Sequence, residues 1–174
     1  VVDQEGEPVK TGEVGYLAIS GEHPGLALRY ENQEEMWQSR FRKGWYLTGD
    51  MSYIDEEGFF WFVSRSDDLI KSRGYLISPK EVEDTLEEHT SVLEAAVVGK
   101  KDEILGQLVK AFIVLRPGKT GSDELVEEIR QMTRDAIAPY KVPKEIEFVE
   151  EFPKTVTGKT MRRELRDRAD EAGN

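Results

Sequence analysis

Residues 64–83 read SRSDDLIKSRGYLISPKEVE, and we interpret this stretch as the junction between two parts of the chain. The sequence before it is rich in predicted strands, whereas strands and helices are mixed after it. Within it, Leu69–Ser72 and Tyr75–Ile77 are short apolar runs on either side of Gly74. This pattern predicts two short strands.

A helix should begin directly after the second of these strands. Ser78 is a predicted N-cap, Pro79 suits the first helical position, and Glu81 stands where a capping box needs an acidic residue. Val82 and Leu86 then fall on one face of the helix, because residues four apart are neighbours on a helix surface.

The sequence upstream of residue 64 predicts mainly β-structure with long loops. The four residues 55–58 read Asp-Glu-Glu-Gly and join two predicted strands as a hairpin. The predicted elements are a strand over Val14–Ser20, a short helix over Asn32–Ser39, and the hairpin strands Met51–Ile54 and Phe59–Val63.

The sequence downstream predicts a small α+β domain. Ser122 begins a helix with Asp123 and Glu124 in its first turn, where acidic side chains favour the helix dipole. The apolar side chains at helical spacing, which should face the core, are Leu125, Ile129, Met132 and Ala136. The other predicted elements are strands over Leu93–Gly99, Val109–Leu115 and Glu145–Val149 and a final helix over Met161–Arg168.

Composition narrows the possible functions. The net charge of −11 disfavours a nucleic-acid partner, which usually meets a basic face. No apolar run approaches the roughly 20 residues needed to span a bilayer, and the absence of cysteine excludes disulfides and thiolate metal sites. The basic segment 154–168 is consistent with a small phosphorylated ligand, and equally with a solvated helix.

The first of three motifs is GWYLTGD over residues 44–50. A carboxylate such as Asp50 at the mouth of a strand can accept hydrogen bonds from two vicinal hydroxyls, for example those of a ribose. The alternative is an aspartate that only shapes a turn, since Thr-Gly-Asp is a common tripeptide.

The second motif is the junction itself. Arg65 offers a planar donor for hydroxyl or phosphate oxygens, and Gly74 permits a positive φ angle or a close approach of the backbone to a ligand. Asp67 and Asp68 lie where the two parts meet, so either is a candidate hinge. The alternative is a charged linker between domains.

The third motif is PKTVTGKTMRR over residues 153–163. Its Gly158-Lys159-Thr160 imitates the end of a P-loop, but a P-loop needs another glycine five residues earlier, and Pro153 occupies that position. Lys159 is therefore a lysine on a glycine turn before a helix. It either places a cation on a phosphate or carboxylate or is an exposed turn lysine without a role.

In this order and at this spacing, the three motifs resemble the last three core motifs of the adenylate-forming superfamily. This superfamily covers acyl-CoA synthetases, the adenylation domains of nonribosomal peptide synthetases, and luciferases. The resemblance extends from about Glu13 to Arg166. It implies that residues 1–66 are the β-rich end of a large N-terminal domain. Residues 67–174 are then a mobile small C-terminal domain with a short mixed sheet and about three helices.

The resemblance also implies a two-step reaction. A carboxylic acid and ATP give an acyl-adenylate and pyrophosphate, and CoA then takes the acyl group and releases AMP. Mg²⁺ is expected with ATP, although no metal ligands can be named in this sequence. The expected partners are the N-terminal domain, the acid, ATP and CoA, and the expected location is the cytoplasm.

Each expected site residue matches a family motif position. By this resemblance Lys159 is the catalytic lysine of adenylation, and Asp50 and Arg65 hold the ribose of the nucleotide. Asp67 is the hinge about which the small domain rotates, and Gly74 lines the passage for the pantetheine arm of CoA.

Within the superfamily, the form of the third motif favours an acyl-CoA synthetase. The segment His23-Pro24-Gly25-Leu26 with Tyr30 looks closest to acetyl- and medium-chain acyl-CoA synthetases, enzymes of fatty acid metabolism. The alternatives are a peptide-synthetase type of adenylation domain and a stand-alone nucleotide- or CoA-binding module. Ser64 departs from the usual glycine, and Leu76 stands where many relatives have arginine. The chain starts at Val1 and lacks the family's upstream phosphate loop, so we expect a fragment that does not activate acids by itself.

Overall fold

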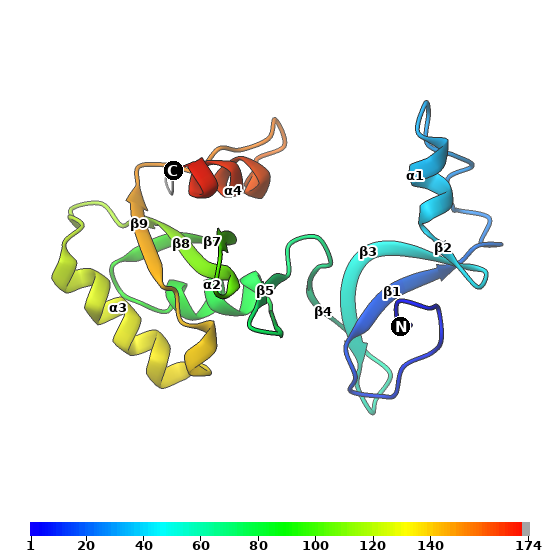
Figure 1. The fold of residues 1–174 in the computed structure, drawn as a ribbon, viewed down its shortest axis with the longest axis horizontal. Coiled ribbons are helices and arrows are strands. Elements are labelled where there is room, and N and C mark those ends of the chain that lie inside the picture. Colours follow the sequence, from blue (N-terminus) through cyan, green and yellow to red (C-terminus); the bar gives the residue numbers. More distant parts are fainter. Residues whose placement is uncertain (172–174) are drawn as a thin grey trace. The chain divides into compact units, whose positions relative to one another are not determined.

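The computed structural model describes residues 1–171 and divides into two compact units. The first unit covers Val1–Asp67 and the second begins at Asp68. Figure 1 shows the course of the chain through both.

The first unit is built on one antiparallel sheet. The long strand β3 pairs with β1, β2 and β4, and β3 and β4 form the predicted hairpin. Strand β3 begins at Trp45, earlier than the predicted Met51, because its first half pairs with β1 and β2 rather than with β4. The elements are β1 (Gly15–Ser20), α1 (Glu34–Ser39), β2 (Phe41–Arg42), β3 (Trp45–Ile54) and β4 (Phe60–Arg65).

Aromatic side chains attach the short helix α1 to this sheet. Trp37 is 7% exposed, and its ring centroid lies 5.0 Å from that of Phe41 and 5.3 Å from that of Tyr46. A helix of this length is marginal by itself in water, so this packing is what holds it in place.

The second unit has a mixed sheet. Its strands follow the order β6-β5-β8-β7 with antiparallel pairing, and β9 adds to β8 in parallel. The strands are β5 (Ile70–Ser72), β6 (Tyr75–Ile77), β7 (Val92–Asp102), β8 (Gly106–Leu115) and β9 (Glu145–Val149). The helices are α2 (Pro79–Glu87), α3 (Asp123–Ala136) and α4 (Arg162–Glu171), with a short 3₁₀ turn at Pro139–Lys141.

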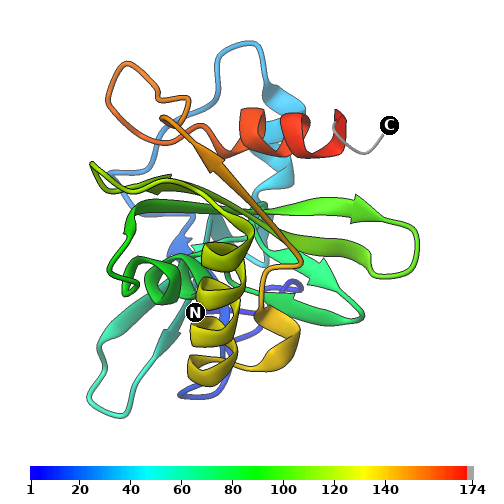
Figure 2. The same cartoon turned by 90° about the vertical axis from the view of Figure 1, so that its left-hand side faces the viewer.

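Two apolar clusters lie on opposite faces of this sheet. Because successive strand residues point to opposite faces, Val97 and Ile113 join α2 and α3 in one cluster, whereas Val98 and Phe112 join α4 in the other. Figures 1 and 2 show α4 on one side of the sheet and α2 and α3 on the other. The α+β class, the mixed sheet and the helices of this unit are thus as predicted.

Two local predictions were wrong. Ser78 is the N-cap of α2, but its side chain makes no cap hydrogen bond, and the Glu81 carboxylate pairs with Lys141 instead. Ala136 is exposed, and the buried position on α3 belongs to Thr133, four residues after buried Ile129. The Thr133 hydroxyl donates to the Ile129 carbonyl at 2.7 Å, which allows a polar residue there.

Candidate functional site

Asp50 and Arg65 form an ion pair across the β3–β4 hairpin. They are direct partners in the antiparallel register, and Arg65 Nη1 lies 2.9 Å from Asp50 Oδ1. The Asp50 side chain is 31% exposed and that of Arg65 is 43% exposed. Both groups are therefore held by the sheet and remain accessible to a ligand.

The residues before Asp50 explain how its carboxylate is placed. The Thr48 hydroxyl donates to the Leu17 carbonyl on β1 at 2.9 Å and accepts from the Asp50 N–H at 3.1 Å. Gly49 has φ +88°, and a Cβ there would lie 2.9 Å from Arg65 Nη2. The glycine thus supplies both the left-handed backbone and the space that the guanidinium occupies.

Asp67 adds a second acidic group beside Arg65. Its Oδ1 lies 3.5 Å from Arg65 Nε. Burial acts to lower the pKa of Arg65, but the charges of Asp50 and Asp67 and their hydrogen bonds outweigh it and hold that pKa above its ordinary value. The guanidinium therefore bridges the strand and the end of the first unit as a permanent cation.

Gly74 lies in the tight turn between β5 and β6. Arg73 and Gly74 both have positive φ, +48° and +83°, which is the geometry of a two-residue hairpin turn. An added Cβ on Gly74 would meet no atom within 4 Å, so the backbone here is open. Beside it, the exposed ring of Tyr75 stacks on Tyr140 with centroids 4.2 Å apart.

Lys159 is exposed on a well-formed turn, which we call the Lys159 turn (residues 154–160). The ends of the turn meet at a bridge between Lys154 and Thr160. Inside it, the Thr155 N–H donates to the Lys159 carbonyl at 2.8 Å, and the Thr155 hydroxyl accepts from the Lys159 N–H at 3.1 Å. Gly158 has φ +82°. The backbone is fixed, while the ammonium group has no hydrogen-bond or ion-pair partner within residues 1–171.

The structure thus brings Asp50, Arg65 and Asp67 together in the first unit. In the part of the chain that the structure describes, no hydrogen bond or ion pair joins Gly74 to Lys159 in the second unit. The sequence reasoning missed one feature near this turn, an ion pair between Glu83 and Arg162. Both residues stood inside the quoted motifs, but 79 positions separate them, and no local pattern pairs them.

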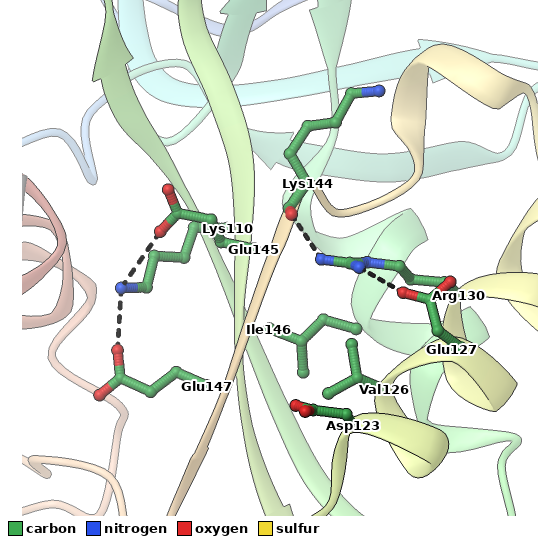
Figure 3. Close-up of a pocket in the computed structure, with 9 residues that line it drawn as sticks. All are labelled: Lys110, Asp123, Val126, Glu127, Arg130, Lys144, Glu145, Ile146 and Glu147. Atoms are coloured by element: carbon green, nitrogen blue, oxygen red, sulfur yellow. Dashed lines mark hydrogen bonds and ion pairs between the residues drawn. The ribbon is translucent and has the colours of Figure 1, made fainter.

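A hollow of about 470 Å³ beside α3 and β9 contains none of the predicted site residues. Figure 3 shows that Lys110 points between Glu145 and Glu147, and that Arg130 reaches the Lys144 carbonyl and Glu127. Lys110 and Arg130 thus pair with groups of the protein itself, which indicates a structural role for these two cations. Within residues 1–171, no group of His, Asp or Glu side chains is arranged to hold a metal ion, and no helix has the length and apolar character to cross a membrane.

Known proteins share this architecture. The family described as AMP-binding enzyme C-terminal domain matches residues 81–159. The chain is 49% identical over 174 residues to 4-hydroxybutyrate–CoA ligase 1 of Metallosphaera sedula, covering 98% of this chain and 31% of that protein. It is 44% identical over 167 residues to acetyl-coenzyme A synthetase of Bacillus subtilis, covering 95% of this chain and 29% of the relative.

A solved structure agrees with these relatives. The anthranilate CoA ligase AuaEII, solved with anthranoyl-AMP, is 40% identical with a TM-score of 0.88, and the match covers 99% of this chain and 33% of that one. The chain therefore spans about a third of the length of the proteins it matches. The family match identifies residues 81–159 as an AMP-binding enzyme C-terminal domain, and over nearly its whole length the chain is similar to acyl-CoA ligases of the adenylate-forming kind.

Proposed function

We propose that this chain is the C-terminal part of an AMP-forming acid–CoA ligase. Its reaction converts a carboxylic acid, ATP and CoA to acyl-CoA, AMP and pyrophosphate through an acyl-adenylate. The observation that carries this proposal is the exposed Lys159 ammonium on a fixed turn, in a chain 49% identical to a CoA ligase. The named relatives also favour a CoA ligase over a peptide-synthetase domain or a stand-alone binding module.

Lys159 would act in the first step. Adenylation brings a carboxylate against a triphosphate, and both are anionic. A lysine that bridges the acid oxygen and the α-phosphate lowers this repulsion and stabilises the charge that builds up in the transition state. The lack of a competing carboxylate on Lys159 among residues 1–171 supports this role, because the ammonium is available to a ligand.

Asp50 and Arg65 would hold the nucleotide. A carboxylate accepts from the two ribose hydroxyls, and a guanidinium donates to their oxygens. The ion pair at 2.9 Å fixes both groups before the nucleotide arrives, so less side-chain entropy is lost on binding.

Asp67 and Gly74 would serve the change from the first step to the second. Asp67 is the last residue of the first unit, which suits a hinge between the end of a large domain over residues 1–66 and a small mobile domain over 67–174. The open backbone at Gly74 suits the close passage of the narrow pantetheine arm.

The rest of the ligase would come from the N-terminal domain, which would supply the phosphate loop, the acid pocket and the site where Mg²⁺ binds together with ATP. We therefore propose that residues 1–174 alone do not form acyl-adenylate. We propose that this ligase is cytoplasmic and acts in fatty acid metabolism, and that a pocket of the N-terminal domain would choose its acid.

The test uses the full-length protein that contains this chain and measures each half-reaction separately. Lys159→Ala should slow pyrophosphate release from acid and ATP by about 100-fold or more, as expected for the loss of a charge that acts in the transition state. It should leave thioester formation from supplied acyl-adenylate nearly unchanged.

A matched control lies in the same unit. Lys119 also follows a glycine with φ +82° and is exposed, so Lys119→Ala removes a similar charge from a similar turn. It should leave both half-reactions at the wild-type rate. An equal loss of both half-reactions in Lys159→Ala would contradict the assigned role.

A further inference from the structure

An ion pair between a buried carboxylate and a partly exposed guanidinium, that of Arg162 at 31% exposure, fastens the helix that follows the Lys159 turn. Arg162 is the first residue of α4, and its Nη2 lies 2.8 Å from Oε1 and 2.6 Å from Oε2 of Glu83 on α2. Glu83 is only 4% exposed, and its Oε1 also accepts from the Val97 N–H on β7 at 2.8 Å. One carboxylate therefore joins α2, β7 and α4.

The burial of Glu83 makes this pairing necessary. A buried carboxylate is costly unless it is both paired and hydrogen-bonded. Burial acts to lower the pKa of Arg162, but the hydrogen bond and charge of Glu83, with the charge of Asp68, outweigh it and hold that pKa above its ordinary value. Asp68 itself pairs with Arg166 at 3.1 Å. Arg162 is thus a permanent cation with one built-in partner.

The direction of the Lys159 turn depends on the two stems that carry it, since its own backbone is closed by internal hydrogen bonds. At the first residue of the turn, Lys154 Nζ lies 3.0 and 3.2 Å from the Glu94 carboxylate, and both side chains are about two-fifths exposed, at 42% and 43%. In the stem after the turn, Arg162 pairs with the buried carboxylate of Glu83. Phe152 and Leu165, at 5% and 1% exposure, pack both stems against the sheet.

These anchors differ in kind. Apolar packing is not directional, and an exposed ion pair contributes little because water screens it. The Glu83–Arg162 pair fixes α4 at its first residue by charged hydrogen bonds to a buried carboxylate, and such bonds are shorter and more directional. A backbone hydrogen bond from the Met161 N–H to the Pro153 carbonyl at 2.8 Å joins the two stems, so the position of Arg162 is passed on to the turn.

We propose that Glu83 and Arg162 are positioning residues that hold the Lys159 turn in the orientation needed for adenylation. This inference rests on the proposed function of Lys159. A misplacement of about 1 Å at a reacting centre can lower a rate by about 100-fold. The thioester step does not use Lys159, so it should be insensitive to the pair.

The test compares two double variants in the full-length protein. Glu83→Gln with Arg162→Met removes both charges without leaving a buried carboxylate unpaired, and the introduced amide oxygen can still accept from the Val97 N–H. Adenylation should fall by about 10- to 100-fold, while thioester formation from supplied acyl-adenylate stays within about twofold of wild type. The matched control, Glu94→Gln with Lys154→Met, removes the exposed pair and should change neither half-reaction by more than about twofold.

A cycle with Lys159→Ala separates positioning from general damage. If the pair acts only through Lys159, its removal should slow adenylation little further once Lys159 is alanine. Full additivity of the two losses, or an equal loss of both half-reactions, would overturn the proposal.

A milder variant covers the case in which the double variant does not fold. Arg162→Lys keeps the cation but shortens its reach to Glu83, and it should give a smaller loss confined to adenylation. Unchanged adenylation in Arg162→Lys, beside a Lys159→Ala variant that is inactive in adenylation, would reject the positioning role alone. Normal adenylation in Lys159→Ala would instead reject the proposed function.

Discussion

Asp50 and Arg65 are direct cross-strand partners on β3 and β4, and their side chains meet at 2.9 Å. They are 15 positions apart in the sequence, and the β3–β4 hairpin brings them next to each other. Two side chains that each suit a ribose are therefore fixed side by side on a rigid element, which is the arrangement that a preorganised binding site requires.

Asp50→Asn tests this pair. The substitution keeps the shape of the side chain but removes its charge, so it should raise the KM for ATP in the full-length protein by about 10- to 100-fold, the value of one or two charged hydrogen bonds. Because the pair is partly exposed, the free energy of unfolding should fall by less than about 1 kcal/mol. An unchanged KM for ATP would show that Asp50 does not contact the nucleotide.

Gly49→Ala should displace Arg65. At φ +88° a Cβ costs about 1–2 kcal/mol in backbone strain, and this one would also lie 2.9 Å from Arg65 Nη2. We expect a higher KM for ATP together with the loss of stability. Gly12→Ala is the control, since Gly12 has φ +81° and open space around it. It should show a similar strain, measured by urea unfolding, with a normal KM.

The sequence predicted the parts of this molecule that depend on local chemistry. Ser122 caps α3 through its hydroxyl, which accepts from the Leu125 N–H at 3.2 Å, and Gly74 has the positive φ that its position suggested. The failures came where a distant group competed with a local one. Glu81 pairs with Lys141, 60 residues away, in place of the capping box.

The same distinction between local and distant groups holds for the candidate site. The motifs named its candidate residues, whose roles stay predictions, but sequence spacing did not reveal which side chains pair with each other. The contact of Asp50 with Arg65 depends on strand register, and that of Glu83 with Arg162 depends on the packing of both α2 and α4 against β7. These are tertiary relationships, and a single sequence does not encode them as a local pattern.

Gly74→Ala separates a CoA passage from a simple turn. The positive φ of +83° predicts about 1–2 kcal/mol of strain whatever the function. If the pantetheine arm passes here, thioester formation should fall by about tenfold or more, whereas adenylation should stay normal, because a methyl group narrows only that path. Gly118→Ala carries the same backbone strain on an open turn of the same unit and should spare both half-reactions. Equal behaviour of the two variants would argue against a passage at Gly74.

The pair of Glu147 with buried Lys110 should make the stability of the second unit depend on pH. Lys110 is 4% exposed, and its Nζ lies 2.8 Å from Glu147 (Figure 3). Burial acts to raise the pKa of Glu147, but the hydrogen bond and charge of Lys110, with those of Arg168, outweigh it and lower that pKa. A carboxyl group whose pKa is lower in the folded state than in the unfolded state stabilises the fold. The stabilisation is complete at pH values above the pKa of the unfolded state, about 4.3 for glutamate. This contribution is lost as the pH falls through the folded value.

Glu147→Gln should therefore lower the free energy of unfolding by about 1–3 kcal/mol at pH 7, the value of a charged hydrogen bond. The difference from wild type should shrink as the pH falls below about 4, since protonation of Glu147 removes the same charge from the wild type. Urea unfolding at several pH values measures it. Glu150→Gln is the control, because Glu150 is exposed next to the same strand, and its effect should stay near zero at every pH. A Glu147→Gln effect that does not change between neutral and acidic pH would mean that the amide disturbs packing rather than charge.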